Sequence, residues 1–222
     1  MPKTAVIAGA TGLVGKELLT LLLNGYAYDK VIALVRRPLH IKHEKLTEMI
    51  CDFDQLETYE EVFKADDIFC CLGTTIKKAK TQAAMYKIDV DYPVAMAKLA
   101  KKKKAKHFLL ISSMNANPNS KIFYSRMKGE LEQKIKALNL PAFSIIHPAL
   151  LVGNRDEFRL GEGAAITFYN ILSKLFSPSK LSSIGIAADV VAEAMYQIAQ
   201  QEKTGTVTYS SKDLYKIAAQ NK

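Results

Sequence analysis

The sequence predicts an α/β protein in which helices cover both faces of a doubly wound parallel sheet. Short apolar runs rich in β-forming residues alternate with stretches of helical periodicity along most of the chain. The connections between these stretches are short, which is typical of right-handed βαβ units. A glycine-rich turn also separates the first apolar run from the first helix.

The expected strands are short apolar runs bounded by turn residues, and they cover residues 3–8, 31–35, 46–51, 67–71, 107–112 and 142–147. The expected helices carry apolar residues at helical spacing, and they cover residues 13–24, 56–64, 82–103, 122–138 and 187–201. Gly25 directly follows the first helix and predicts its C-cap. After residue 148 the alternation weakens.

We expect a single domain over residues 1–222, because 222 residues with 49% hydrophobic content can bury a sizeable core and no linker or repeat divides them. Residues 149–185 predict a small lobe over the carboxyl edge of the sheet, the edge where open α/β sheets bind ligands. Within this lobe, residues 164–176 carry apolar side chains at helical spacing. We expect this stripe to contact an apolar substrate, or else to pack in the core or against a dimer partner, and the sequence leaves these readings open.

Composition restricts the location and the partners. No apolar run near the N-terminus is long enough to span a bilayer, and residues 1–10 predict a strand and a turn rather than a signal peptide. The three cysteines are odd in number, and no Cys/His spacing matches a metal site. We therefore expect a reduced cytoplasmic protein that holds no metal.

The formal net charge of +9 predicts a solvated basic surface. The lysine run at residues 101–104 ends an expected helix, where cations interact favourably with the last carbonyls. No zinc spacing, aromatic interleaving or nucleic-acid motif accompanies the charge, which argues against a nucleic-acid partner. The alternative is an anionic ligand, and a phosphorylated cofactor would suit the positive field.

The turn G-A-T-G-L-V-G at residues 9–15 is typical of a dinucleotide site. Gly9 permits a sharp turn, Gly12 lets a diphosphate approach the backbone, and Gly15 lets the helix pack closely on the sheet. The neighbouring amides would point at the anion from a helix N-terminus. A plain βα turn is the alternative, which three glycines at this spacing disfavour. The expected cofactor contacts of the turn are Gly9, Thr11, Gly12, Leu13, Val14 and Gly15.

Arg36 and Arg37 follow the second expected strand, where NAD-selective folds usually place an acidic residue. Arginine makes up only 5 of the 31 basic residues, so two together are not generic surface charge. A guanidinium fork matches a 2′-phosphate. The pair therefore predicts NADP(H) as the cofactor.

Two Tyr-x-x-x-Lys pairs occur, and their positions separate them. Tyr26 and Lys30 lie between the first helix and the second strand, away from the expected ligand edge. Tyr124 and Lys128 open the helix that follows the fifth strand, and a helix places them one turn apart on one face. A free phenol has a pKa near 10, and a nearby ammonium favours the phenolate. The second pair therefore predicts an acid/base site.

These features resemble the short-chain dehydrogenase/reductase superfamily, in particular its extended and atypical branches. The spacing GxxGxxG, a strand-end serine, the tyrosine and the lysine occur in superfamily order. The segments C-L-G-T-T, D-V-D-Y, K-H-F-L-L-I-S-S and Y-S-R-M-K-G-E-L-E are similar to the Tat-interacting-protein-like group. The resemblance covers nearly the whole chain and implies a Rossmann fold that binds NADPH.

The resemblance also implies the chemistry. Hydride would pass between a nicotinamide and a small carbonyl or alcohol substrate, and Tyr124 would donate a proton to the carbonyl oxygen. Lys128 would tune the phenol and bond the nicotinamide ribose. Ser113, the second serine of its pair, would stabilise the oxygen, whereas Ser112 is expected to be a buried strand-end residue.

Further cofactor contacts follow from the resemblance alone. They are Asp52 and Phe53 at the adenine, Cys71, Leu72, Gly73 and Thr74 along the middle of the cofactor, and Pro148, Leu151 and Arg159 in the loop after the sixth strand. Two positions depart from the family. His147-Pro148-Ala149 stands where Arg-Pro-Gly is usual, and Asp89 stands where many members have the asparagine of a proton relay.

The sequence thus favours an NADPH-dependent oxidoreductase acting on a small carbonyl compound. An NADP(H)-sensing regulatory or scaffold protein with little turnover is the alternative, because the relay asparagine is missing and the surface is basic. A nucleotide-sugar epimerase or dehydratase is disfavoured because the lobe is short. The substrate, the reaction direction, and any homodimer or protein partner are left open.

Overall fold

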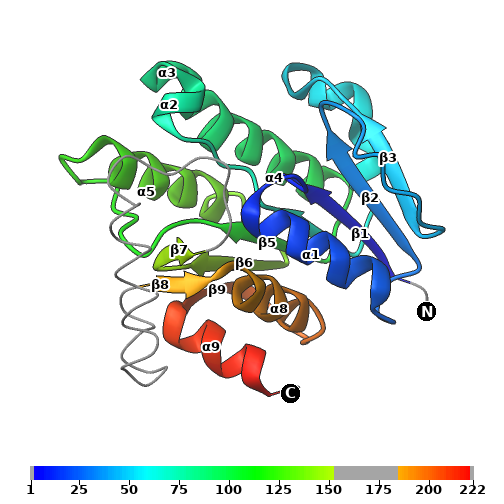
Figure 1. Cartoon of the computed structure of the whole chain (residues 1–222). Helices are drawn as coiled ribbons and strands as arrows, with labels where there is room; N and C mark the ends of the chain where they lie inside the picture. Colours follow the sequence, from blue (N-terminus) through cyan, green and yellow to red (C-terminus); the bar gives the residue numbers. More distant parts are fainter. Residues whose placement is uncertain (1–2, 153–184, 221–222) are drawn as a thin grey trace.

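The computed structural model describes residues 3–152 and 185–220 of the chain. Its centre is a seven-stranded parallel sheet with the order β3-β2-β1-β4-β5-β6-β9 (Figure 1). Its strands are β1 (Thr4–Ala8), β2 (Lys30–Val35), β3 (Leu46–Ile50), β4 (Asp67–Cys70), β5 (His107–Ile111), β6 (Ala142–His147) and β9 (Gly205–Ser210). The chain builds outward first from β1 to β3 and then from β4 to β9, so the strand order reverses between β1 and β4. Ligands of open α/β sheets bind at such a switch point.

Two layers of helices cover the sheet (Figure 1). One layer consists of α1 (Leu13–Asn24), α8 (Ala188–Ala199) and α9 (Ser211–Ala219). The other consists of the 3₁₀-helix η1 (Phe53–Phe63), α4 (Tyr92–Lys102) and α5 (Phe123–Lys136). The short helices α2 (Ile76–Ala79) and α3 (Gln82–Tyr86) and the π-helix η2 (Lys87–Asp91) precede α4.

The strands are apolar on both sides because both sides of the sheet are covered. In β1, Ala5 and Ile7 pack in the cluster that includes α1 and α8, whereas Val6 and Ala8 pack in the cluster that includes α4 and α5. All four side chains are fully buried. This is the near-continuous apolar pattern that parallel strands require. The predicted fold class, a doubly wound parallel α/β sheet, is confirmed.

The expected elements agree closely with the observed ones in the first two thirds of the chain. The first helix and the sixth strand have the predicted bounds. The helix expected at residues 56–64 is a 3₁₀-helix that begins earlier and contains two non-helical residues, Gln55 and Tyr59. The single helix expected at residues 82–103 consists of α3, η2 and α4, because a π-helical stretch interrupts the α-helical hydrogen bonding.

Besides η2, five elements of the described residues were not expected from the sequence: α2, β9, α9 and the two strands of a small parallel pair, β7 (Leu150–Val152) and β8 (Gly185–Ala187). Strand β9 lies at the edge of the sheet and is mostly exposed, so it lacks an apolar run. Helix α9 begins at a capping box in which Ser210 and Asp213 bond reciprocally.

Most of the predicted lobe and Arg159 fall in residues 153–184, outside the described residues. The extent of the single domain therefore stays a prediction. Among the helices that the structure does describe, none combines the length and the apolar character needed to cross a bilayer.

Candidate functional site

In the glycine turn between β1 and α1, backbone segments pack closely against each other at two positions. Gly9 has a φ of +84°, and a Cβ there would lie 2.4 Å from the carbonyl oxygen of Cys71. A Cβ at Gly15 would lie 2.1 Å from the carbonyl oxygen of Gly9. Gly9 thus permits the turn to pass the end of β4, and Gly15 permits α1 to pack against the turn.

The N-terminus of α1 opens at this turn without a side-chain cap of its own. Gly12 is the N-cap residue and has no side chain to accept from the first amides. The first turn of the helix also carries no acidic residue. Thr11 and Gly12 are exposed, Leu13 is half-buried, and Val14 is buried, so Val14 can offer a ligand only its backbone. Uncapped amides at an exposed helix N-terminus fit the diphosphate of a dinucleotide.

Arg36 and Arg37 lie beside this turn at the same edge of the sheet. They follow Val35, the last residue of β2, and both are exposed. Ala8 of β1 is the register partner of Leu34 in β2, so the glycine turn and the arginine pair leave adjacent strands at the same level. Tyr26, by contrast, is fully exposed and precedes β2, at the opposite edge.

The predicted adenine contacts already have structural roles. Asp52 is exposed, and its carboxylate caps η1 by accepting from the amide of Asp54 at 2.9 Å. Phe53 is buried, and its ring lies 5.4 Å from that of Tyr92. Asp52 keeps an accessible carboxylate, whereas Phe53 belongs mainly to the core.

The residues after β4 run from the core to the surface. The amide of Cys71 donates to the carbonyl of Ala8 at 2.9 Å, so this segment continues alongside β1. Cys71, Leu72 and Thr74 are half-buried, and Gly73 is exposed. Burial raises the pKa of the Cys71 thiol well above its ordinary value, so this thiol is protonated at neutral pH.

Tyr124 and Lys128 lie on one face of α5, as predicted, and the ammonium of Lys128 is buried. Lys128 is 3% exposed, and its Nζ lies 6.0 Å from the centroid of the Tyr124 ring. The same Nζ lies 2.9 Å from Oδ1 of Asp89, and Asp89 is 1% exposed. The two groups therefore form an ion pair that is buried on both sides.

Asp89 lies in the π-helix η2, and its second oxygen binds the segment after β4. Oδ2 accepts from the backbone amide of Thr74 at 2.8 Å. Burial alone would lower the pKa of Lys128, but Asp89 together with Tyr124 and Cys70 outweighs burial and raises it. Lys128 is therefore a charged ammonium inside the protein.

The two serines after β5 have different surroundings. Ser112 is buried and its hydroxyl donates to the Glu132 carboxylate, which confirms that it is a buried strand-end residue. Ser113 is half-buried, and its hydroxyl accepts from the amide of Asn115 at a long 3.5 Å. Within the described residues, the Ser113 hydroxyl thus makes only this long hydrogen bond, and it lies at the carboxyl edge of the sheet.

Sequence reasoning missed Gly129, which lets the loop before α5 pack against that helix. A Cβ at Gly129 would lie 2.1 Å from the nitrogen of Pro118. The amide of Asn117 in the same loop donates to the carbonyl of Ser125 at 2.9 Å. These contacts fix the loop that carries Ser113 relative to the helix that carries Tyr124. The glycine directly after Lys128 gave no separate signal in the sequence.

Sequence reasoning also missed Glu132, which lies one turn beyond Lys128 on α5. Its Oε1 lies 2.7 Å from Nε2 of His147 and also accepts from Ser112. Burial raises the pKa of Glu132, but the hydrogen bonds from His147 and Ser112 outweigh burial and lower it. His147 thus has a partner in α5, and Pro148 after it is buried.

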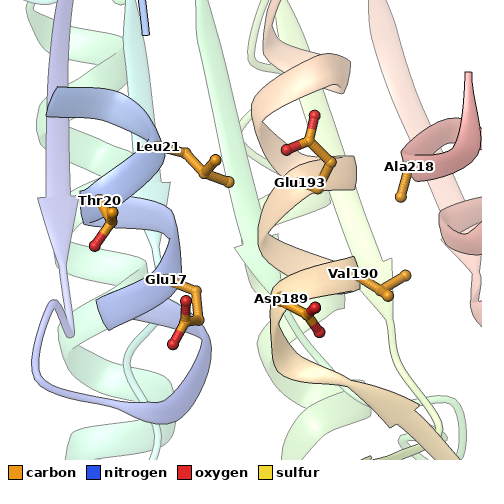
Figure 2. A pocket seen from close by; sticks show the side chains of 7 residues that line it. All are labelled: Glu17, Thr20, Leu21, Asp189, Val190, Glu193 and Ala218. Carbon is orange, nitrogen blue, oxygen red and sulfur yellow. The ribbon is translucent and has the colours of Figure 1, made fainter. Parts of the chain in front are cut away.

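A cavity in the described part of the chain lies away from the predicted site residues. This cavity of about 160 Å³ lies among α1, α8 and α9, as Figure 2 shows, and it is lined by Glu17, Thr20, Leu21, Asp189, Val190, Glu193 and Ala218. None of the predicted site residues lines it. Within residues 3–152 and 185–220, no group of His, Cys, Asp and Glu could hold a metal ion.

Comparison with known proteins agrees with this geometry. A family model described as NAD(P)H-binding matches residues 9–160. Protein HTATIP2 of Rattus norvegicus is 37% identical over 174 residues, which are 77% of this chain and 72% of the rat protein. The protein named FMP52, mitochondrial, of Candida glabrata is 35% identical over 207 residues, which are 90% of this chain and 86% of the fungal protein.

Solved structures share the fold at low sequence identity. The Bordetella bronchiseptica enzyme WbmH in complex with NAD⁺ has a TM-score of 0.71 at 18% identity, over 97% of this chain and 80% of that one. The dTDP-4-dehydrorhamnose reductase of Bacillus anthracis in complex with NADP has a TM-score of 0.65 at 17% identity, over 98% and 81%. These likenesses show the fold alone. The family match and the relatives together show that the chain belongs to the NAD(P)H-binding family, in the atypical short-chain dehydrogenase/reductase-like group that contains HTATIP2 and FMP52.

Proposed function

We propose that the protein is an NADPH-dependent oxidoreductase that transfers hydride to a small carbonyl substrate, with Tyr124 as the acid. One observation carries the proposal. Tyr124 and a buried, charged Lys128 share one face of α5, and Asp89 connects Lys128 to the segment after β4. That segment runs past Gly9, so Tyr124, Lys128 and the glycine turn lie at one edge of the sheet.

NADP(H) is the preferred cofactor because of the arginine pair. Arg36 and Arg37 are exposed beside the glycine turn, and guanidinium groups bind phosphate by paired hydrogen bonds. When bound, the dihydronicotinamide would supply a hydride. The uncapped amides at the N-terminus of α1 would hold the diphosphate, and Asp52 would accept from the adenosine end.

The chain's own residues divide the remaining work. Tyr124 would donate its proton to the carbonyl oxygen, and Ser113 would hold that oxygen by a hydrogen bond. Lys128 would hold its ammonium beside the phenol and bond the nicotinamide ribose. The proposed contacts of Leu72, Gly73 and Leu151 with the cofactor would use their backbone and apolar surface at the same edge.

Single-turnover traces of NADPH oxidation with a panel of small aldehydes and ketones test the proposal. Tyr124→Phe removes only the phenol oxygen and is expected to abolish turnover, while NADPH affinity changes less than about twofold. Tyr26→Phe is the matched control, because Tyr26 is fully exposed at the other edge. Normal turnover in Tyr124→Phe would refute the assignment.

An NADP(H)-sensing binding protein is the second candidate, and the Asp89–Lys128 pair favours it. An ammonium already paired with a carboxylate at 2.9 Å is less available to a ribose hydroxyl than an unpaired one. Tight NADPH binding without turnover of any carbonyl in the panel would support this candidate. A homodimer or a protein partner belongs to the same alternative.

We also propose a cytoplasmic location, because Cys51, Cys70 and Cys71 are all free and free thiols are typical of a reducing compartment. The fungal relatives carry the word mitochondrial in their names. Fluorescence microscopy of the tagged full chain in its own cells tests the location, and co-localisation with a mitochondrial marker would overturn it.

A further inference from the structure

The pairing of Asp89 with Lys128 bears on the direction of the reaction. We propose that Asp89 is a positioning residue that fixes the Lys128 ammonium and screens its charge from Tyr124, so that Tyr124 works as a proton donor in carbonyl reduction. The inference rests on the proposed function, because it concerns the same tyrosine.

Asp89 is held on two sides. Its Oδ2 accepts from the amide of Thr74 at 2.8 Å, and its Oδ1 lies 2.9 Å from Lys128 Nζ. The residue is 1% exposed, so water does not compete for either oxygen. The carboxylate is carried by the π-helix η2, and π-helical turns occur frequently at functional sites. Asp89 therefore fixes the ammonium relative to both α5 and the end of β4.

The screening follows from the distances. Lys128 Nζ lies 6.0 Å from the Tyr124 ring centroid, a separation at which an unpaired ammonium favours the phenolate. The Asp89 carboxylate carries the opposite charge 2.9 Å from the same nitrogen. Because Coulomb interactions fall only with the inverse of distance, the carboxylate cancels a large part of the lysine's field at the ring.

The other titratable groups around Lys128 do not replace Asp89. Cys70 of β4 interacts with Lys128, but burial raises the pKa of its thiol to about 12, so it is neutral in the physiological range. Tyr124 interacts with Lys128 from their shared helix. Asp89 is thus the carboxylate that acts on Lys128 among the described residues.

Glu132, the next acidic residue along the same face of α5, has other partners. Its Oε1 accepts from Ser112 of β5 and contacts His147 of β6, and its Oε2 lies 3.4 Å from Lys136. Its charge is therefore balanced within its own group of contacts, one helical turn away from Lys128.

The proton and electron movements of the reaction show why the charge near Tyr124 matters. In the proposed reduction, NADPH would supply the hydride that adds to the carbonyl carbon and would become NADP⁺. The carbon–oxygen π pair moves to the oxygen, and the Tyr124 hydroxyl proton passes to that oxygen. The products are the alcohol and a phenolate, which solvent reprotonates. Alcohol oxidation needs the phenolate at the start. Screening of Lys128 removes an influence that favours the phenolate and so suits proton donation by Tyr124 in reduction.

Carbon-13 NMR of tyrosine labelled at Cζ tests the inference in nucleotide-free protein, independently of turnover. The Tyr124 signal is assigned by its loss in Tyr124→Phe. In Asp89→Asn the pH midpoint of the Tyr124 transition is expected to fall by about one unit, because the carboxylate no longer opposes Lys128. Asp91→Asn is the matched control, since Asp91 is an exposed carboxylate in the same η2 segment, and no shift is expected there.

Asp89→Asn leaves an uncompensated buried ammonium and can fail to fold for that reason. The double variant Asp89→Asn/Lys128→Met avoids this problem and provides a second test. It removes both charges, so screening predicts a midpoint within about half a unit of the wild-type value. An unchanged midpoint in folded Asp89→Asn, or a rise above one unit (roughly the unscreened effect of an ammonium) in the double variant, would overturn the inference. Failure of the proposed function would instead appear as absent NADPH oxidation, with these midpoints still measurable.

Discussion

Glu132 Oε1 lies 2.7 Å from His147 Nε2, and this contact joins helix α5 to the end of strand β6. The same oxygen accepts from Ser112 at the end of β5. One buried carboxylate therefore ties together three elements whose ends surround the proposed site. Its neighbours on α5, Tyr124 and Lys128, depend on the position that these contacts give the helix.

Replacement of Glu132 by glutamine should destabilise the fold by about 1 to 3 kcal/mol at pH 7, because the ionised partner of Ser112, His147 and Lys136 becomes neutral. The pKa of Glu132 is lowered in the folded state, so its contribution is present above its ordinary value of 4.5 and is lost as the pH falls through the folded value. The difference between wild type and Glu132→Gln in urea denaturation should therefore shrink below pH 4.5. Glu57→Gln, at an exposed position, is the control. A difference that grows on acidification would contradict this reading.

Comparison of alanine variants at Gly9 and Gly205 separates the stability cost of backbone strain from the cost of steric crowding. Both have positive φ, +84° and +72°. A Cβ at Gly205 meets no atom within 4 Å, whereas one at Gly9 meets the Cys71 carbonyl oxygen at 2.4 Å. Gly205→Ala should cost about 1 kcal/mol for its backbone conformation. Gly9→Ala should cost about 1 to 3 kcal/mol more, because the end of β4 must also move.

Thermal denaturation of the two glycine variants measures this difference. NADPH titrations should show weaker binding in Gly9→Ala and unchanged binding in Gly205→Ala. Equal losses of stability in the two variants would show that the turn at Gly9 is less crowded than the distances indicate.

His107 makes stability depend on pH in the mildly acidic range. It is buried with Nε2 2.8 Å from Ser144 Oγ, and burial, with Lys3 as a smaller cause, lowers its pKa from 6.5 to about 4. Below pH 6.5 the unfolded chain binds a proton at His107, whereas the folded chain does not bind it until the pH falls to about 4. Stability from this residue is thus full above pH 6.5 and falls by about 3 kcal/mol as the pH drops towards 4.

His107→Gln removes this titration and keeps a polar side chain for Ser144. Urea denaturation between pH 4 and 6.5 should then show a flatter pH dependence than in the wild type. His40→Asn is the control, because His40 is exposed and asparagine tolerates its φ of +57°. Parallel curves for the wild type and His107→Gln would mean that His107 is protonated in the folded protein.

The arginine pair should set the preference for NADPH. Replacing Arg36 and Arg37 together by glutamine is expected to weaken NADPH binding tenfold or more, since each charge-assisted hydrogen bond contributes about 1.5 to 3 kcal/mol. NADH binding should change less than about twofold, because NADH has no 2′-phosphate. Lys101→Gln, an exposed change of charge at the end of α4, is the control. Equal weakening of both nucleotides would indicate a general field rather than a phosphate contact.

The sequence predicted well what local periodicity encodes. Helix α1 and strand β6 have the expected bounds, because an amphipathic helix and a buried strand each leave a complete pattern. Strand β9 left none, because an edge strand with exposed threonines lacks the apolar run. The π-helix η2 was invisible for a similar reason, since one widened turn does not change the spacing of apolar residues enough to be read.

The residues of the candidate site also fall into two groups: those that a local pattern encodes and those whose contacts depend on packing. The glycine turn and the Tyr124–Lys128 face are local patterns, so the sequence shows them directly. The partners of Glu132 and Asp89 come from other elements, and Lys128 lies 39 positions after Asp89 in the chain. Such contacts depend on how η2, α5, β5 and β6 pack, which no local pattern records. The family resemblance singled out Asp89, but only the structure shows that its carboxylate pairs directly with Lys128.

Calorimetric titration of the full chain with NADPH and with NADH tests most directly whether the edge formed by the glycine turn and the arginine pair holds a phosphorylated dinucleotide. The expected result is one NADPH bound per chain, at least tenfold more tightly than NADH, a ratio that the charge-assisted hydrogen bonds of one phosphate can supply. The contrary result is the absence of binding heat for both nucleotides at several temperatures. Equal affinity for the two would leave the dinucleotide site standing and would contradict its assignment to NADPH.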